Sequence, residues 1–459
     1  MVSLIIEKIS TKYTAFELFH AFKDEPYCFL LDSSMENEKL GRYTFMGSKP
    51  FLVFKSKNQG ITIEENNNTR SLIGNPFDIL KELLEKYKNE DNGMIPFLGG
   101  AVGYFAYDMG HHIEELPRIA LDDVRIPDSC FGFYDSIIAI DHQGSDTYII
   151  ANGIKEKPEN LVEEIKRKLS TINALSLDRM PGIACGEIQS NFVKEDYLKA
   201  VQSIKDYIRA GDIYQANLTQ RFKCDTEEAP FSIYSRLRQL NPAPFACYMN
   251  FGEGYILSSS PERFLKIHDN LIETRPIKGT RPRGRTAEED NANKAELLSS
   301  EKDKSELLMI VDLERNDLGK VSRTATVRVP ELFYPEEYAT VHHLVAAVTG
   351  EKQEGLDAID VIKAAFPGGS ITGAPKIRSM EIIDELEPTQ RNIYTGSIGY
   401  MGFNGSIDLN IAIRTIVMKD GTAYFQAGGG IVWDSIPELE YEETLHKARA
   451  LFRTLKNEQ

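Results

Sequence analysis

Apolar residues recur at spacings that divide the first part of the chain into short helices and strands. Helical spacing predicts helices over Ala15–Phe22 and Pro76–Tyr87. The apolar run Cys28–Leu31 and the segments Tyr43–Phe54 and Ile61–Glu65 are typical of strands. This region is therefore predicted to be rich in β-structure with a few helices.

A polar connection follows the last elements of this region. Asp135–Ile150 is predicted to form a hairpin, and Pro158–Ile172 a helix. The low periodicity of Asn173–Asn191 favours a boundary there, which separates a region 1–190 from a region 191–459. A surface linker on one intertwined structural body fits that segment equally well.

The second region mixes strands and helices without strict alternation. Ser299–Leu313 and Pro437–Leu455 have helical spacing, whereas Ile407–Ile413 is strand-like. Repeats of 20–50 residues are absent from the sequence, which excludes solenoids and propellers. The predicted class is α+β.

Composition narrows the choice of function. A chain of 459 residues with 42% hydrophobic residues can bury a large core, in two or three domains or one two-lobed body. A formal net charge of −16 argues against partners such as nucleic acid or anionic lipid. The five cysteines have no metal or disulfide spacing, and no apolar stretch reaches membrane-spanning length. A soluble cytoplasmic protein is predicted.

A basic segment, Thr274–Arg285, is the first candidate for chemistry. It holds one lysine and four arginines without an acid, which alone is typical of a solvated loop. Lys278 differs because it stands between Ile277 and Gly279, where partial burial would lower its pKa and create a nucleophile. Gly279 permits close approach of a ligand, and Thr280 adds a hydroxyl.

Glutamates in helical settings are the second candidate. Glu440 and Glu443 project from one helix face, and Glu306 belongs to another predicted helix. Such carboxylates suit Mg²⁺, whose octahedron water and substrate oxygens can complete. Because Lys447 follows Glu443 at i+4, an ordinary surface salt bridge is the simpler alternative.

Two glycine-rich runs, Pro367–Lys376 and Ala427–Val432, match neither a P-loop nor a dinucleotide fingerprint. Their exposed amides suit carboxylates as well as phosphates. Arg414 offers a planar guanidinium for a carboxylate. His343 lies in an apolar context, where a structural histidine and a proton carrier are both plausible. The residues alone indicate an Mg²⁺-assisted enzyme acting on a small polyanion.

The order of these motifs resembles the chorismate-utilising enzymes. The matching runs extend from about Phe192 to the C-terminus, and the N-terminal runs FLLDSS and GRYTFMG extend the resemblance to almost the whole chain. The main matches are SSSPERF (Ser258–Phe264), RPIKGTRPRG (Arg275–Gly284), DLERNDLGKV (Asp312–Val321), VHHLV (Val341–Val345), AAFPGGSITGAPKIRSMEIIDELEP (Ala364–Pro388), GSIGYMG (Gly396–Gly402), IAIRT (Ile411–Thr415) and AGGGIV.

Within that family, position 278 separates the products. Anthranilate synthase large subunits have alanine there, so Lys278 is similar to the large subunits (component I) of aminodeoxychorismate synthases. The pair Asn217-Leu218 agrees with that branch, and Arg275 departs from the glutamate of isochorismate- and salicylate-forming members. The resemblance implies conversion of chorismate and ammonia to 4-amino-4-deoxychorismate, the precursor of 4-aminobenzoate for folate, through a covalent Lys278 intermediate.

The resemblance also implies roles for individual residues. Glu262 would be the general acid beside the nucleophile Lys278, and His343 an active-site histidine. Glu306 and Glu443 would bind Mg²⁺, with Glu440 as an additional or water-mediated ligand. The remaining implied residues would hold the substrate carboxylates and the metal-bound end: Gly279, Thr280, Thr372, Tyr394, Arg414, Gly428 and Lys447.

A partner and a second ligand follow from the same resemblance. The sequence lacks a glutaminase-type cysteine, so a separate glutamine amidotransferase subunit is implied as the ammonia source in a heterodimer. The resemblance allows a bound tryptophan, but it makes no prediction about whether tryptophan regulates the enzyme. Its pocket would include Leu31, Asp32, Ser33, Ser34, Asn241, Pro242 and Phe245.

The implied fold is a two-lobed sandwich of large antiparallel β-sheets with outer helices. An anthranilate synthase large subunit, for tryptophan synthesis, is the principal alternative. A catalytically inactive relative that only binds tryptophan or a glutaminase is a third hypothesis, which the intact set of Lys278, Glu306 and Glu443 disfavours.

Overall fold

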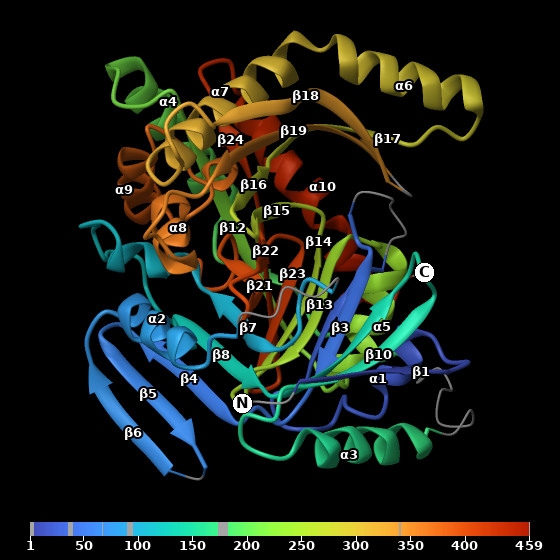
Figure 1. The fold of residues 1–459 in the computed structure, drawn as a ribbon. Coiled ribbons are helices and arrows are strands. Elements are labelled where there is room, and N and C mark those ends of the chain that lie inside the picture. The colour runs from blue at the N-terminus through green and yellow to red at the C-terminus, as the bar shows by residue number, and fades with distance from the viewer. Residues whose placement is uncertain are drawn as a thin grey trace.

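Two antiparallel sheets face each other in the computed structural model, which describes residues 4–34, 40–66, 68–89, 95–172, 182–338 and 341–458 (Figure 1). The first sheet has the order β1 (Ile5–Ile9), β10 (Asp146–Ala151), β9 (Ser136–Asp141), β3 (Tyr43–Gly47), β2 (Phe29–Asp32), β13 (Phe245–Asn250), β14 (Tyr255–Ser260), β23 (Thr415–Lys419), β24 (Thr422–Ile431), β12 (Gln215–Asp225) and β11 (Gln189–Ser190), and β20 (Gly373–Ala374) also pairs with β12.

The second sheet carries the basic segment at one edge. Its order is β17 (Ile277–Pro282), β19 (Val341–Glu351), β16 (Leu271–Arg275), β15 (Arg263–His268), β22 (Ile407–Asn410), β21 (Ser397–Gly402), β7 (Gly100–Phe105), β8 (Ser129–Tyr134), β4 (Leu52–Lys57), β5 (Gly60–Glu65) and β6 (Asn68–Ile73), and β18 (Arg328–Glu337) also pairs with β19. Each sheet contains strands from both sides of residue 190.

Helices cover the outer face of each sheet (Figure 1). Their apolar sides pack on the first sheet from α1 (Ala15–Phe19), α3 (Pro158–Ser170), α4 (Lys194–Ala210), α5 (Pro230–Leu240) and α10 (Pro437–Leu455). The second sheet is covered by α2 (Pro76–Lys86), α6 (Ala287–Ser299), α7 (Glu301–Gly319) and α8 (Ala358–Ala365). α9 (Lys376–Leu386) packs on β12 and β20 of the first sheet and also contributes Met380 and Ile383 to the apolar cluster of the second. Two 3₁₀ helices, η1 (Tyr107–His112) and η3 (Gly369–Ile371), lie in connections.

A third apolar cluster fills the space between the sheets. Phe29 and Met249 of the first sheet meet Val53 and Tyr104 of the second in it. The burial of such side chains at about 25 cal/mol per Å² is the main force that holds the sheets together. The predicted α+β class, with two large antiparallel sheets and outer helices, is confirmed.

The predicted single strand Tyr43–Phe54 is wrong, because it forms two strands in different sheets. β3 ends at Gly47 in the first sheet, and β4 begins at Leu52 in the second. Between them Lys49 has a φ of 53° and precedes Pro50. A left-handed residue followed by proline ends the extended run and redirects the chain.

Several other boundaries differ from the sequence pattern by a few residues. α1 ends at Phe19, and β22 ends at Asn410 before the predicted Ile413. The helix predicted from Ser299 begins at Glu301, because the Ser300 side chain accepts a hydrogen bond from the amide of Asp303 at 3.2 Å and caps it. Residues 173–181 of the predicted connection Asn173–Asn191 lie outside the described residues, and its remainder includes the short strand β11.

Ser300→Ala is expected to lower the free energy of unfolding by about 1 kcal/mol, because α7 loses its N-cap. Denaturant unfolding followed by circular dichroism measures this change. Ser299→Ala is the matched control: Ser299 is exposed and donates only to the Glu296 carbonyl, so a change below about 0.5 kcal/mol is expected. Equal losses in both variants would contradict the capping role.

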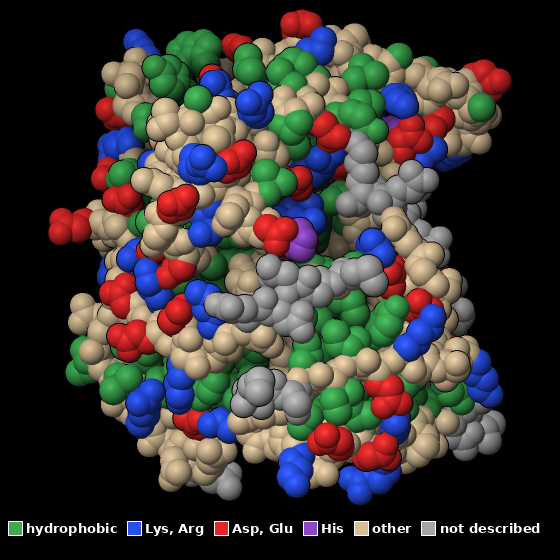
Figure 2. Space-filling model, in the orientation of Figure 1, with side chains coloured by type: hydrophobic (Ala, Val, Ile, Leu, Met, Phe, Trp, Pro, Cys, Tyr) green, Lys and Arg blue, Asp and Glu red, His purple; other side chains and the backbone are tan. Residues whose placement is uncertain are grey.

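The surface mixes charges of both signs. Lys and Arg side chains are interspersed with Asp and Glu over the face seen in Figure 2. In the part of the chain that is described, none of the helices is both apolar and long enough to cross a lipid bilayer.

Candidate active site

Lys278 lies half-buried on the edge strand β17. The pairing of β17 with β19 shifts register between Lys278 and Thr280, at Gly279, whose φ is 71°. A Cβ on Gly279 would lie 2.9 Å from Cγ of Asp303, so only glycine lets α7 pack this closely. The bulge thereby places Lys278 beneath α7.

The surroundings of the Lys278 amine favour the loss of its proton. Its Nζ donates to the Ser370 carbonyl at 3.3 Å, and no carboxylate within the described ranges lies at ion-pair distance. Burial lowers the pKa of Lys278, while the charges of Glu306 and Glu262 oppose that shift. A neutral amine in this setting is a nucleophile.

Glu262 lies at the turn between β14 and β15, close to Ser370, the residue whose carbonyl accepts from Lys278. The Ser370 hydroxyl donates to Glu262 Oε1 at 2.6 Å, and the Ile277 amide donates to it at 3.4 Å. Burial raises the pKa of Glu262 to about 6, against the effect of its hydrogen bonds and of Lys278. The group can therefore carry a proton near neutral pH, as a general acid must.

His343 lies on β19 opposite Thr280. Thr280 Oγ1 and His343 Nδ1 are 2.8 Å apart, and the Tyr338 ring meets the imidazole edge-on at 4.9 Å. Burial, aided by the charge of Arg414, lowers the pKa of His343 to about 3. The imidazole is consequently neutral at physiological pH and can act as a hydrogen-bonding group or a base.

Three charged side chains of α10 converge on Gly429 of β24. A Cβ there would lie 3.2 Å from Glu443 Oε1, 3.5 Å from Glu440 Oε2 and 3.6 Å from Lys447 Nζ. Lys447 also pairs with Glu443 at 2.7 Å and donates to the Gly428 carbonyl at 3.0 Å. Glycine at 429 therefore leaves room for these groups or for a ligand among them.

Glu306 of α7 faces the same region. Burial raises its pKa, and the charges of Lys278 and Glu443 both act on it. The described residues contain no ready-made group of three His, Cys, Asp or Glu side chains at metal-binding distance. Carboxylate oxygens of Glu306, Glu440 and Glu443 are nevertheless the donors that Mg²⁺ prefers, and that ion keeps several waters. The donor set fits Mg²⁺ with few direct protein contacts.

Arg414 is a half-buried cation between β22 and β23. Its guanidinium has no acidic partner within the described part of the chain, and its backbone φ is 52°. Burial lowers its pKa, while the nearby Tyr394 phenol opposes the shift. An arginine remains charged in spite of this, so the group is suited to an anionic ligand. Thr372 is fully buried and donates to the Gly368 carbonyl at 3.0 Å.

Three of the four arginines in the basic segment are already paired. Arg275 binds Glu331 and Glu336, Arg281 binds Glu296 and Asp303, and Arg283 binds Asp290. The basic segment is thus a structural network, whereas Lys278 remains without an ion pair in the described residues. Sequence spacing could not show this, because most of the partners are distant in the chain.

Glu314 was not singled out from the sequence. It is buried on α7, and a Cβ on Gly369 would lie 3.4 Å from its Oε1. Burial raises the pKa of Glu314 to about 7, and Lys376 opposes the shift. Glu314 lies one residue beyond the predicted helix Ser299–Leu313, and its place in the DLERNDLGKV match was the only available signal.

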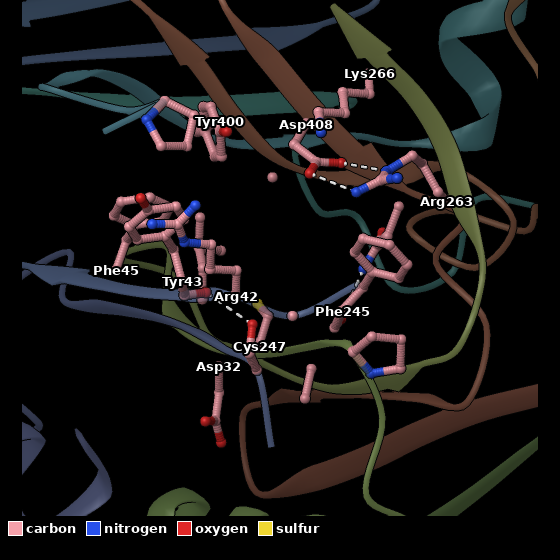
Figure 3. A pocket seen from close by; sticks show the side chains of 18 of the residues that line it. Asp32, Arg42, Tyr43, Phe45, Phe245, Cys247, Arg263, Lys266, Tyr400 and Asp408 are labelled. Carbon is pink, nitrogen blue, oxygen red and sulfur yellow. Dashed lines mark hydrogen bonds and ion pairs between the residues drawn. The ribbon is translucent and has the colours of Figure 1, made fainter. Parts of the chain in front are cut away.

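A cavity of about 370 Å³ lies between the sheets (Figure 3). Of the predicted tryptophan pocket, Leu31, Asp32, Ser33 and Phe245 line this cavity, together with Arg263, which Asp408 holds at 2.9 and 3.0 Å.

The other predicted members of that pocket, Ser34, Asn241 and Pro242, do not line the cavity. Ser34 bonds to both backbone groups of Ala243, and Asn241 donates to the Ser259 carbonyl. Ser34 and Asn241 therefore contact the backbone behind the residues that line the cavity.

Comparison with known proteins identifies the family. A profile described as chorismate binding enzyme matches residues 14–453. Anthranilate synthase component 1 of Acetivibrio thermocellus is 42% identical, covering 99% of this chain and 95% of that protein. Aminodeoxychorismate synthase component 1 of Bacillus subtilis (strain 168) is 40% identical, covering 92% and 91%.

A solved structure agrees with these relatives. The crystal structure of anthranilate synthase component I from Streptococcus pneumoniae TIGR4 superposes with a TM-score of 0.82 at 34% identity, covering 90% of this chain and 92% of that one. Matches of this identity and coverage extend over both sheets and the whole candidate site. The chain belongs to the chorismate binding enzyme family.

Proposed function

We propose that this chain converts chorismate and ammonia into 4-amino-4-deoxychorismate, for 4-aminobenzoate and folate synthesis, with Lys278 as a covalent nucleophile. The observation that supports this most directly is the half-buried Lys278, whose amine lies 3.3 Å from the Ser370 carbonyl without an ion-pair partner in the described residues. A direct attack of ammonia on the ring would need no lysine in that position.

The proposed reaction has two displacements. The neutral Lys278 amine forms a bond to C2 of the ring, both double bonds of the ring diene shift by one position, and the C4 hydroxyl leaves as water with the proton of Glu262. Ammonia then bonds to C4, the electrons return, and the C2–nitrogen bond breaks to release Lys278. Glu262 takes up the surplus proton. Each step exchanges one nucleophile for another on the same ring face.

The other charges would position the substrate. Arg414 and Lys447 would bind its carboxylates, and Tyr394 would lie beside the first of these. The glutamates Glu306, Glu440 and Glu443 would hold Mg²⁺, which when bound supplies positive charge near the ring carboxylate. The backbone at Gly428 and Gly429 approaches this region closely enough to add hydrogen bonds.

Glu443→Gln is expected to raise the Mg²⁺ concentration for half-maximal activity at least about tenfold, because one anionic ligand becomes neutral. The measurement is a Mg²⁺ titration after chelator treatment, with calorimetry as a second readout. Glu442→Gln, an exposed neighbour that faces Lys194, is the control and should behave as wild type. An unchanged titration for Glu443→Gln would remove this residue from the metal site.

Anthranilate synthesis is the competing function, favoured by the 42% identity to an anthranilate synthase component 1. Incubation with chorismate, Mg²⁺ and ammonium separates the two. We expect 4-aminobenzoate only after an aminodeoxychorismate lyase is added. Anthranilate fluorescence without the lyase would overturn the proposal.

Ammonia would come from a separate glutamine amidotransferase subunit. Relatives named component 1 imply a second component, and the five cysteines here are free thiols without a glutaminase context. Free thiols also suit a reducing compartment, and we place the enzyme in the cytoplasm.

The cavity between the sheets is proposed to bind L-tryptophan. Tyr43, Phe45 and Phe245 offer aromatic contacts, and Lys266 a half-buried cation for a carboxylate. At 100 times its dissociation constant, the ligand should stabilise the fold by about 2.7 kcal/mol. Thermal unfolding with L-tryptophan, with L-alanine as control, measures this. Equal melting temperatures with both amino acids would contradict binding.

A further inference from the structure

Four large apolar side chains are exposed at the edge of the candidate site. They are Tyr214 after α4, Trp433 and Ile436 after β24, and Leu439 in the first turn of α10, with exposed fractions of 74%, 55%, 52% and 61%. We call them the rim patch. Aromatic residues that stay exposed beside one another are typical of protein interfaces.

Backbone pairing brings the members of the rim patch together. The ladder between β12 and β24 ends at the pair Ala216–Ile431, and Tyr214 and Trp433 each lie two residues beyond that pair, at the same end of the sheet. The Lys205 amine of α4 donates to the Ser435 carbonyl, which fixes the loop that holds Trp433 and Ile436.

The rim patch lies directly beside the proposed chemistry. Leu439 precedes Glu440 in α10, and Trp433 follows the strand that contains Gly429. The Tyr214 amide donates at 2.7 Å to the Ala374 carbonyl, in the loop that also holds Ser370 and Thr372. A protein bound here would cover the edge of the site.

Acidic side chains border the rim patch. Asp212, Asp434, Glu438 and Glu442 are all exposed, and Asp434 and Glu438 have no ion pair within the described residues. The matching surface would have an apolar centre and a border of Lys and Arg. A second copy of this chain fits poorly, because a two-fold contact would set the acidic border against itself.

We propose that the rim patch is the docking surface for the ammonia-supplying glutaminase subunit, an assignment that rests on the proposed function. Free ammonia becomes ammonium in water at neutral pH, and ammonium is not a nucleophile. A glutaminase seated on the edge of the site can pass ammonia to C4 without that loss. The unpaired acids of the border orient a basic partner surface.

Trp433 provides a direct readout, because it is the only tryptophan of the chain. Labelled with 5-fluorotryptophan, the full chain should give one ¹⁹F resonance that shifts when the cognate glutamine amidotransferase subunit is added. An unshifted resonance at saturating partner would overturn the proposal. So would a resonance that already shifts with the concentration of this chain alone, which would assign the patch to a second copy.

Leu439→Asp tests the consequence for catalysis, and an acid in the first turn of α10 is compatible with folding. At limiting glutaminase we expect at least a tenfold loss of glutamine-dependent product, with ammonium-dependent product within twofold of wild type. Ile73→Asp, at an exposed site on β6, should keep both activities. Unchanged glutamine dependence in Leu439→Asp would refute the docking surface alone, whereas a wild-type chain inactive with ammonium would refute the proposed function.

Discussion

Replacing Lys278 with alanine is expected to lower the rate of aminodeoxychorismate formation at least about 10³-fold, because the two-displacement route loses its nucleophile. The variant should fold, since a half-buried amine without an ion pair in the described residues is exchanged for a small apolar group. Ammonium is used as the amine donor, so that the measurement is independent of any partner. Product is followed by coupling to the lyase.

Lys199→Ala is the matched control. Lys199 is 77% exposed on α4 and pairs only with Asp196 three residues before it, so its rate should stay within twofold of wild type. Anthranilate is expected as a minor product of Lys278→Ala, because alanine at this position recreates the pattern of anthranilate synthases. A variant that forms aminodeoxychorismate at the wild-type rate would exclude the covalent intermediate.

Replacing Glu262 with glutamine is expected to cost between about 10² and 10⁴ in kcat, because the departing hydroxyl loses its proton donor. Glutamine keeps the acceptor for the Ser370 hydroxyl, so the local geometry is retained. Glu253→Gln, on an exposed turn, is the control and should leave kcat unchanged. A rise in KM with an unchanged kcat would assign Glu262 to substrate binding.

The pH profile distinguishes this role from a structural one. As the pH rises above about 6, the protonated fraction of Glu262 falls. Over the same range the neutral fraction of Lys278 rises, until the pH reaches the lowered pKa of that amine. The two trends cancel, so the wild-type rate should level off above pH 6. In Glu262→Gln the residual rate should continue to rise up to the pKa of Lys278. A plateau that persists in the variant would contradict the assignment.

Elements dictated by local chemistry could be predicted from the sequence. The helix Pro437–Leu455 has the predicted bounds, because proline at its first position and an apolar stripe define it. The hairpin around His142–Asp146 forms for the same kind of reason, with a largely buried apolar strand on either side of a short polar turn. The meeting of Glu440 and Glu443 at Gly429 followed from their spacing of three on one helix.

Features that depend on distant parts of the chain could not be predicted. Whether Arg275 is free to attract a substrate depends on Glu331 and Glu336, which β18 brings across the sheet. The contribution of Arg263 to the cavity depends on its bidentate pair with Asp408, 145 positions away. The partition of Tyr43–Phe54 between two sheets is likewise a tertiary choice, because both halves alternate in the same way.

The interleaving of the two sheets has a consequence for synthesis on the ribosome. Strand β2 pairs with β13, and the Ser34 hydroxyl contacts the Ala243 backbone, a partner 209 positions later. The first 190 residues therefore emerge with unpaired strand edges and with half of the cluster between the sheets exposed. Native pairing must wait for most of the chain, so nascent and truncated forms should depend on chaperones far more than the finished enzyme does.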